Sequence, residues 1–231
     1  MLAVLYSVTG HGGASGYIAV MVLLGFAPQE IKPLALVLNV VVSTVATILF
    51  YRAGHFRWNL FWPFVVGSVP LAMVGGYLQL PTHWFNLLLG VVLIFSALRI
   101  AIRTSPDADL REPAFVVAML SGAGIGFFSG LIGIGGGIVL TPLILLMGWA
   151  NPKQAAAVSA PFILLNSLSG LMGFSVQAAQ GIQHDVIPLA LTVLMGGLLG
   201  SYLGSRTLPM KAIARVLSAV LLIAGFKLFY V

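Results

Sequence analysis

The chain carries very little charge. Only 7% of its 231 residues are Asp, Glu, Lys or Arg, and 60% are hydrophobic, whereas soluble domains carry roughly 25% charged residues. So few charges cannot cover a water-facing surface, which excludes a soluble enzyme, a nucleic-acid-binding domain and a disordered chain. The sequence therefore predicts an all-α polytopic membrane protein, with the lipid bilayer as a partner and no nucleic acid.

Cysteine is absent altogether, which excludes disulfides, thiolate metal sites and cysteine nucleophiles. The four histidines are too scattered for a metal-ligand spacing. Neither a Walker motif nor a GxSxG elbow occurs. The five acidic residues lie between or at the ends of the apolar runs, so paired carboxylates inside the membrane are also missing. We expect no catalytic residue, no metal and no cofactor, and therefore no enzyme.

Apolar runs make up most of the chain. A helix needs about 20 apolar residues to cross a bilayer, and runs of that order lie at 33–51, 60–78, 85–102, 155–176, 186–203 and 210–229. Two further runs, 1–27 and 114–147, are interrupted by glycines. Run 114–147 would be ~50 Å long as one helix. We therefore expect a break near 132–137, where glycines cluster.

The two interrupted runs are related by an internal repeat. A displacement of 123 residues places 10–27 on 133–150 and superimposes three glycines of each turn. The chain is therefore interpreted as two homologous halves, 1–102 and 114–231, joined by a charged linker at 103–113. Each half holds one glycine-broken helix, re-entrant or discontinuous, and three transmembrane helices.

The basic residues favour an inverted arrangement of these halves. If each broken run returns to its own side, nine Lys and Arg lie on one side and two, Lys32 and Lys227, on the other. If every run crosses once, the division is six to five. The positive-inside rule prefers the first arrangement, in which three crossings per half make the halves inverted repeats. An eight-helix bundle with parallel halves stays as the alternative.

Two broken helices at matching positions predict a substrate site. Irregular backbone in a membrane is tolerated only where protein or a water-filled cavity covers it. The half-helices that follow the turns present N-termini with free N–H groups, which favour an anion. The candidate substrate-binding residues are His11, Gly12, Gly13, Ser15, Asn39, Ser43, Gly135, Gly136, Gly137, Thr141, Ser159 and Asn166.

Structural roles are the alternatives at these positions. The glycines could serve helix packing, and membrane Ser and Thr usually bond their own i−4 carbonyl. His11 is open between binding the anion, taking a proton and making a structural hydrogen bond, since its unperturbed pKa is near ~6.5. The four tryptophans, Trp58, Trp62, Trp84 and Trp149, are expected to be interfacial anchors.

The segment from Gly130 to Pro142, followed by Gly148 and by the run from Ala155 to Ser159, resembles the signature of the TauE/SafE sulfite exporter family, also called TSUP transporters. The resemblance extends over almost the whole chain, through its length, its duplicated halves and one glycine motif per half. The first half departs from the signature, with Ala19 where the second half has Pro142.

The resemblance implies secondary transport of a sulfur-containing or organic anion, such as sulfite, a sulfonate or thiosulfate, across the bacterial inner membrane. Alternating access of the two halves would move it. A membrane subunit, or a permease for a different small solute, is the alternative. The sequence leaves open the substrate, the direction, the coupling ion and the oligomeric state, a homodimer included.

Overall fold

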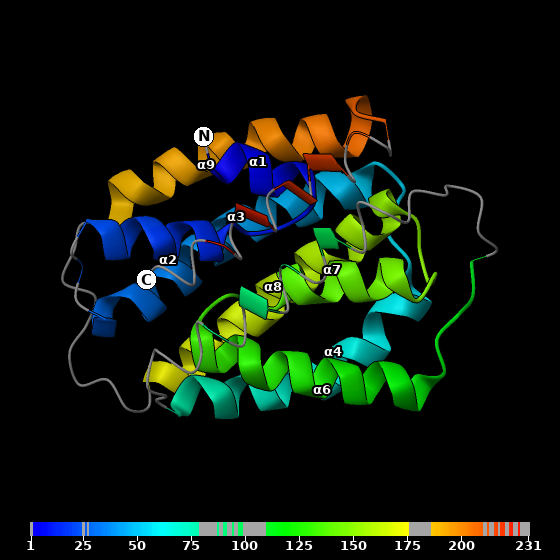
Figure 1. The fold of residues 1–231 in the computed structure, drawn as a ribbon, viewed down its shortest axis with the longest axis horizontal. Helices are drawn as coiled ribbons and strands as arrows, with labels where there is room; N and C mark the ends of the chain where they lie inside the picture. The colour runs from blue at the N-terminus through cyan, green and yellow to red at the C-terminus, as the bar shows by residue number, and fades with distance from the viewer. Residues whose placement is uncertain are drawn as a thin grey trace.

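The computed structural model describes residues 2–24, 28–78, 110–175 and 186–209 continuously, with isolated residues elsewhere. Every regular element in these stretches is a helix, so the predicted all-α class is confirmed (Figure 1). The predicted helices 85–102 and 210–229, and most of the linker 103–113, lie outside the continuous stretches.

Eight α-helices and a π-helical turn form the described part. They are α1 (Leu2–Val8), α2 (Ala14–Leu23), α3 (Pro28–Arg52), α4 (Trp58–Tyr77), α6 (Phe115–Ile132), α7 (Gly137–Leu146), α8 (Pro152–Ser175), α9 (Val186–Tyr202) and η1 (Leu203–Thr207). Five segments are long and apolar enough to cross a membrane, namely α3 from Glu30, α4, α6, α8, and α9 with η1. The chain is thus a multi-pass membrane protein.

Two helices begin earlier than predicted. Both α3 and α8 start on a proline, Pro28 and Pro152, instead of near 33 and 155. Proline suits the first helical position because its φ is already helical and its missing N–H would be unpaired there. As a result Lys32, which precedes the predicted start of this helix, lies in the first part of α3.

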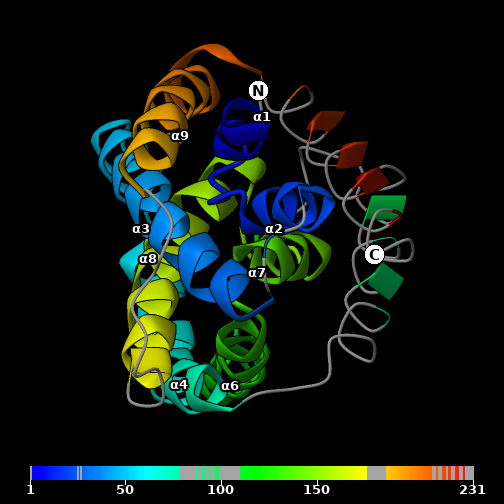
Figure 2. The same cartoon turned by 90° about the vertical axis from the view of Figure 1, so that its left-hand side faces the viewer.

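The helices form three layers. Figure 2 shows α1 and α9 at the top, α4 and α6 at the bottom, and α3 and α8 between them. The principal contacts are α4 with α6, α4 and α3 with α8, α3 with α9, and α1 with α9. Thus α4, from the first half, packs on α6 of the second, and α9 packs on α1 in the same way.

Glycines at every fourth residue bring these helix pairs close together. On α6, Gly122, Gly126 and Gly130 face the backbone of α4 so closely that a Cβ at any of them would collide with it. On α9 and η1, Gly200 and Gly204 meet α1 in the same manner. This spacing is the small-residue packing motif of membrane helices. Packing therefore accounts for these glycines, which are distinct from the clustered ones in the turns.

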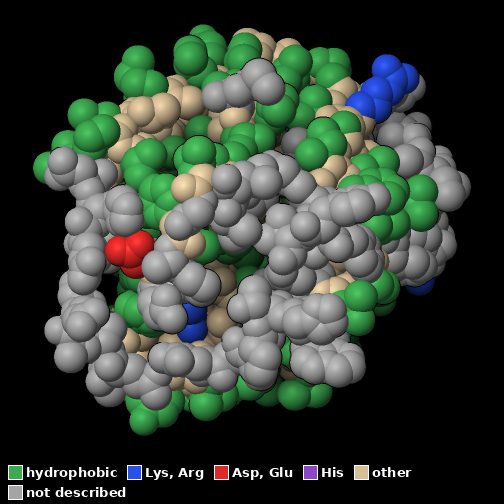
Figure 3. All heavy atoms as spheres, turned by 60° about the vertical axis from the view of Figure 1, so that its left-hand side comes forward, with side chains coloured by type: hydrophobic (Ala, Val, Ile, Leu, Met, Phe, Trp, Pro, Cys, Tyr) green, Lys and Arg blue, Asp and Glu red, His purple; other side chains and the backbone are tan. Residues whose placement is uncertain are grey.

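The outer surface is strongly apolar. Large side chains such as Leu120, Met195 and Leu199 are more than half exposed, and Figure 3 shows hydrophobic side chains over most of its coloured surface. Trp58 and Trp62 are 61% and 50% exposed. The anchor role predicted for Trp149 is wrong, because this ring is only 6% exposed and packs against Phe64 with their centroids 5.9 Å apart.

Three connecting segments and the helical turn η1 meet at one end of the molecule. Arg57, just before α4, forms an ion pair with Glu112 at 3.0 Å and donates to the carbonyl of Trp149 at 3.1 Å. His55 contacts the Ser205 carbonyl at 3.1 Å. The α3–α4 loop, the segment before α6, the α7–α8 loop and η1 therefore share an end. The pair α6–α7 leaves this end and returns to it.

Candidate functional site

The backbone conformation of the two glycine turns is closely similar. In the first turn Gly10 and Gly13 have φ of 74° and 89°, and in the second Gly133 and Gly136 have φ of 87° and 78°. Only glycine adopts such values without strain. Both α2 and α7 begin directly after these residues, at Ala14 and Gly137. The offset between the two helix starts is the one that the sequence repeat predicts.

One backbone hydrogen bond of the first turn recurs in the second at the same offset. The His11 N–H donates to the Tyr6 carbonyl at 2.9 Å, and the Ile134 N–H donates to the Ser129 carbonyl at 3.3 Å. Each bond closes the end of the helix that precedes the turn. The two turns are therefore built alike, although the side chains they carry at this point, His11 and Ile134, differ completely.

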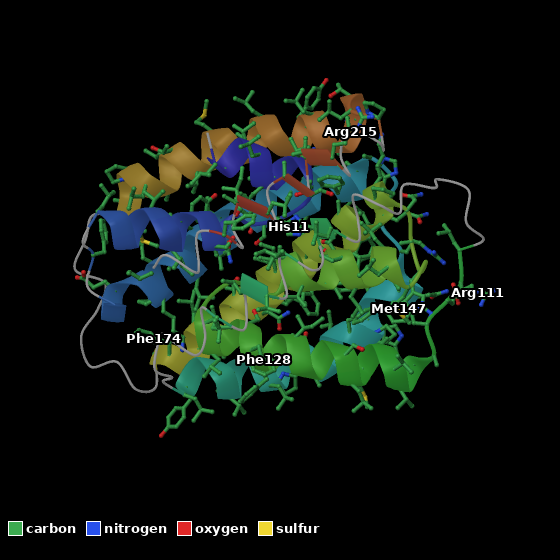
Figure 4. The ribbon with its side chains drawn as sticks, viewed as in Figure 1. His11, Arg111, Phe128, Met147, Phe174 and Arg215 are labelled. Atoms are coloured by element: carbon green, nitrogen blue, oxygen red, sulfur yellow. The ribbon has the colours of Figure 1, made fainter. Side chains whose placement is uncertain are left out.

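The two turns meet at a small cavity, with room for about one water molecule. Its described lining residues are Tyr6, His11, Gly12, Gly13, Ala14, Ser15, Ile134, Ile138 and Ile163. None of these carries a formal charge. In Figure 1, α2 and α7 extend away from this region in opposite directions, and Figure 4 shows His11 near the centre of the molecule. The N-termini of both helices thus lie at one neutral cavity.

Asn39, on α3, lies between the two turns. Its side chain is fully buried, with Oδ1 beside Gly12 and Nδ2 beside Gly135. A Cβ at Gly135 would come within 2.9 Å of Nδ2, and a Cβ at Gly12 would collide with Oδ1. Neither amide atom has a hydrogen-bond partner among the described residues. Buried polar groups are almost always paired, so this amide makes Asn39 a candidate for binding a polar ligand.

His11 is the second unpaired group at the cavity. Its side chain is 2% exposed, and Nδ1 lies 2.6 Å from Oγ1 of Thr9. The Thr9 hydroxyl in turn donates to the Tyr6 carbonyl at 2.9 Å. The imidazole also lies beside the backbone of Gly137, at the start of α7. Within the described part of the chain, Nε2 has no partner.

Several polar side chains around the turns were not among the predicted residues. One of them is Tyr6, whose hydroxyl accepts a hydrogen bond from the predicted Ser15 at 2.9 Å. The Tyr17 hydroxyl lies beside Gly13, Cβ of Ser129 is near Gly136 and Oγ of Ser167 is near Gly135. The hydroxyl oxygens of Tyr17, Ser129 and Ser167 are buried and unpaired among the described residues. A tyrosine or serine close in sequence to a glycine turn is the signal that could have identified Tyr17 and Ser129, whereas Ser167, on α8, carries no such signal.

Of the predicted residues, His11, Gly12, Gly13 and Ser15 line the cavity. Asn39 is not a lining residue but lies against Gly12, which is, and against Gly135. Gly136 and Gly137 form the start of α7. Four of these eight residues thus line the cavity, and the other four are close to it in the chain or in contact with one of its lining residues.

The other four predicted residues lie outside the cavity lining. Thr141 on α7 and Ser159 on α8 form a buried hydroxyl pair 2.6 Å apart. Ser43 donates to the carbonyl of Asn39 at 2.5 Å, the i−4 bond that its structural alternative predicts. Asn166 donates through Nδ2 to the Phe162 carbonyl at 2.9 Å, and its Oδ1 is unpaired among the described residues.

The chemistry of the site is that of neutral hydrogen bonding. Donors are Nδ2 of Asn39 and the N–H groups that begin α2 and α7, and Oδ1 of Asn39 is an acceptor. Nε2 of His11 donates or accepts according to the tautomer of the ring. The described residues contain no cluster of three His, Asp or Glu that could hold a metal ion. The arrangement can bind a small polar ligand and release it again without breaking an ion pair.

Comparison with known proteins agrees with this picture of a membrane protein. Residues 1–228 match the family model described as "Sulfite exporter TauE/SafE". A "Probable membrane transporter protein y4hK" of Sinorhizobium fredii is 36% identical over all of this chain and 95% of its own length. The "Probable membrane transporter protein YunE" of Bacillus subtilis is 28% identical over 82% of this chain and 76% of its own. No solved structure matches the chain.

Proposed function

Since the chain belongs to the TauE/SafE sulfite exporter family and is a membrane transporter of that type, we propose that it is a secondary transporter of a small sulfur-containing anion. Sulfite, a sulfonate and thiosulfate are the candidates, and the membrane crossed is the bacterial inner membrane. The observation that carries this proposal is the unpaired amide of Asn39 between the two glycine turns.

An oxyanion suits the groups around the cavity. Two helix N-termini supply backbone donors and partial positive charge, and the glycines let a ligand approach the backbone closely. The described lining residues have no Lys or Arg that would bind an anion too tightly for release. An inside-negative membrane potential drives anions outward, so we propose export.

Movement of the halves against each other would open this site. Asn39 and the first turn belong to the first half, whereas Gly135 and the second turn belong to the other. A relative rotation of the halves would therefore separate the groups that hold the ligand. We propose that the halves act as inverted repeats in alternating access, with the end that holds Arg57 in the cytoplasm.

Uptake into liposomes tests the proposal. Purified protein would be reconstituted and supplied with labelled sulfite, thiosulfate or methanesulfonate, with and without a pH gradient. We expect saturable uptake of at least one anion, and loss of that uptake in Asn39→Leu, which has the same shape without the amide. Protein-free liposomes give the background. If no anion enters above background, the proposal is wrong.

A further inference from the structure

Resting on the proposed function, we infer that the transported species is a singly charged oxyanion that still carries an acidic hydrogen, such as hydrogen sulfite. Nε2 of His11 accepts that hydrogen in a hydrogen bond. The helix N-termini and Nδ2 of Asn39 hold the oxygens that bear the charge. The site thereby distinguishes a hydrogen-bearing oxyanion from one with oxygens alone.

The Thr9 hydroxyl decides which nitrogen of His11 carries the proton. This hydroxyl has one hydrogen, which it donates to the Tyr6 carbonyl at 2.9 Å, because a carbonyl can only accept. If the hydroxyl donated to the imidazole instead, the Thr9 hydroxyl oxygen and the Tyr6 carbonyl oxygen would lie 2.9 Å apart with no hydrogen between them. We therefore assign Nδ1 of His11, 2.6 Å away, as the donor to Thr9. In the neutral ring, Nε2 is left as a pure acceptor.

The surroundings keep the imidazole in this neutral form. No carboxylate occurs among the described lining residues, so an imidazolium would be a buried charge without a counter-ion. The titratable neighbours on α1 and α2 are the phenols of Tyr6 and Tyr17. On α3 the charged groups are at its ends, where Lys32 donates to the carbonyl of Gly76 at 2.9 Å.

An acceptor in this position selects against anions without a hydrogen. A fully ionised oxyanion would place its oxygen lone pairs against Nε2 and against Oδ1 of Asn39, and both contacts are repulsive. A hydrogen-bearing anion satisfies one of these acceptors while its other oxygens meet the backbone donors. Sites that require a substrate hydrogen reject the analogue lacking it far more strongly than apolar pockets reject a change of size.

The test compares sulfite with methanesulfonate in proteoliposomes at two pH values, one below and one above the second ionisation of sulfite. Internal and external pH are kept equal, and protein-free liposomes correct for leakage. For the unaltered protein we expect the KM for total sulfite to rise at the higher pH in proportion to the loss of hydrogen sulfite. Methanesulfonate, which has no acidic hydrogen, should show a kcat/KM at least about tenfold lower at both pH values.

Two variants separate acceptance of a hydrogen bond from titration of the ring. His11→Gln supplies an amide oxygen that accepts but does not titrate, and we expect it to retain the preference for sulfite at the lower pH. His11→Ala removes the acceptor, so its KM should increase at least about tenfold at the lower pH and no longer respond to pH. Monodisperse elution and equal reconstitution of both variants control for folding.

The outcomes distinguish this inference from the function on which it rests. If the unaltered protein transports methanesulfonate as efficiently as sulfite, or if its KM for sulfite is the same at both pH values, the inference is overturned and the transport function stands. If His11→Gln loses the preference as completely as His11→Ala, hydrogen-bond acceptance by Nε2 is not what selects the anion. Absence of all uptake would overturn the transport function itself.

Discussion

The two glycine turns have the same backbone conformation but present different side chains to the cavity. In both, glycines with positive φ end one helix and start another, and the same backbone hydrogen bond closes the preceding helix. The first turn presents His11 to the cavity, and the second presents Ile134. Asn39 of α3 reaches between the turns, and Ile163 of α8 lies against the same glycines.

The difference teaches that the backbone conformation of the turns is duplicated, whereas the polar side chains proposed to bind the ligand are not. Both halves supply a helix N-terminus, so the backbone donors are present twice. His11 and Asn39 come from the first half, and at the offset of 123 residues their counterparts in the second half are Ile134 and Phe162, both apolar. Such asymmetry suits a ligand with two unlike ends, one bearing charge and one bearing hydrogen.

The largest effect is expected from a side chain placed in either turn. Gly13→Leu and Gly136→Leu each combine a positive φ with crowding, by Tyr17 in the first case and by Ile125 and Phe162 in the second. We expect both to abolish sulfite uptake at normal membrane abundance. Gly124→Leu is the matched control, because a Cβ at this exposed position of α6 meets nothing within 4 Å. Full uptake by either turn variant would show that its turn takes no part in transport.

The next prediction concerns the side of the membrane on which each end of the molecule lies. The chain has no cysteine, so single cysteines can be labelled without background. We expect Arg52→Cys and Lys153→Cys to react with an impermeant maleimide from the cytoplasmic side, and Tyr77→Cys, at the opposite end of α4, from the other side. Reaction of Lys153→Cys from the side opposite to Arg52→Cys would support eight simple crossings and contradict a returning α6–α7 pair.

A smaller effect is expected from the polar pairs next to each turn. Tyr6→Phe leaves the Ser15 hydroxyl at the cavity without its acceptor, and we expect sulfite uptake to decrease severalfold. Thr141→Val breaks a pair outside the cavity lining. It should lower the free energy of unfolding by about 0.6 kcal/mol, a typical interhelical hydrogen bond in a membrane, with little change in KM. The reverse order of effects on uptake would place the ligand at Thr141.

The glycine breaks could be predicted because they have a local cause. Clustered glycines weaken a helix, and a run the length of 114–147 is too long for one crossing, so the break between α6 and α7 follows from the sequence. The match of the first turn followed from the repeat. The early start of α3 and α8 could not be found by hydropathy, because the polar residues after Pro28 and Pro152 resemble a loop.

The partners of the polar residues were not predictable. Whether Asn39 contacts a cavity or another helix depends on how α3 is rotated against the turns, and an uninterrupted apolar run hides that rotation. Thr141 was equally ambiguous, and its partner Ser159 is set by the packing of α7 on α8. Trp149 was misplaced because it follows a turn, where an interfacial position is common, although the α7–α8 loop folds it onto Phe64.

Binding of sulfite to purified protein tests the central claim, that one ligand site lies between the two turns. A ligand at 100 times its Kd stabilises the folded state by about 2.7 kcal/mol, so sulfite should raise the melting temperature saturably. Asn39→Leu should melt no lower than the unaltered protein, because it removes an unpaired buried amide, but it should lose the increase caused by sulfite. Asn59→Leu, at an exposed position of α4, should keep it. A full sulfite-induced increase in Asn39→Leu would contradict the claim.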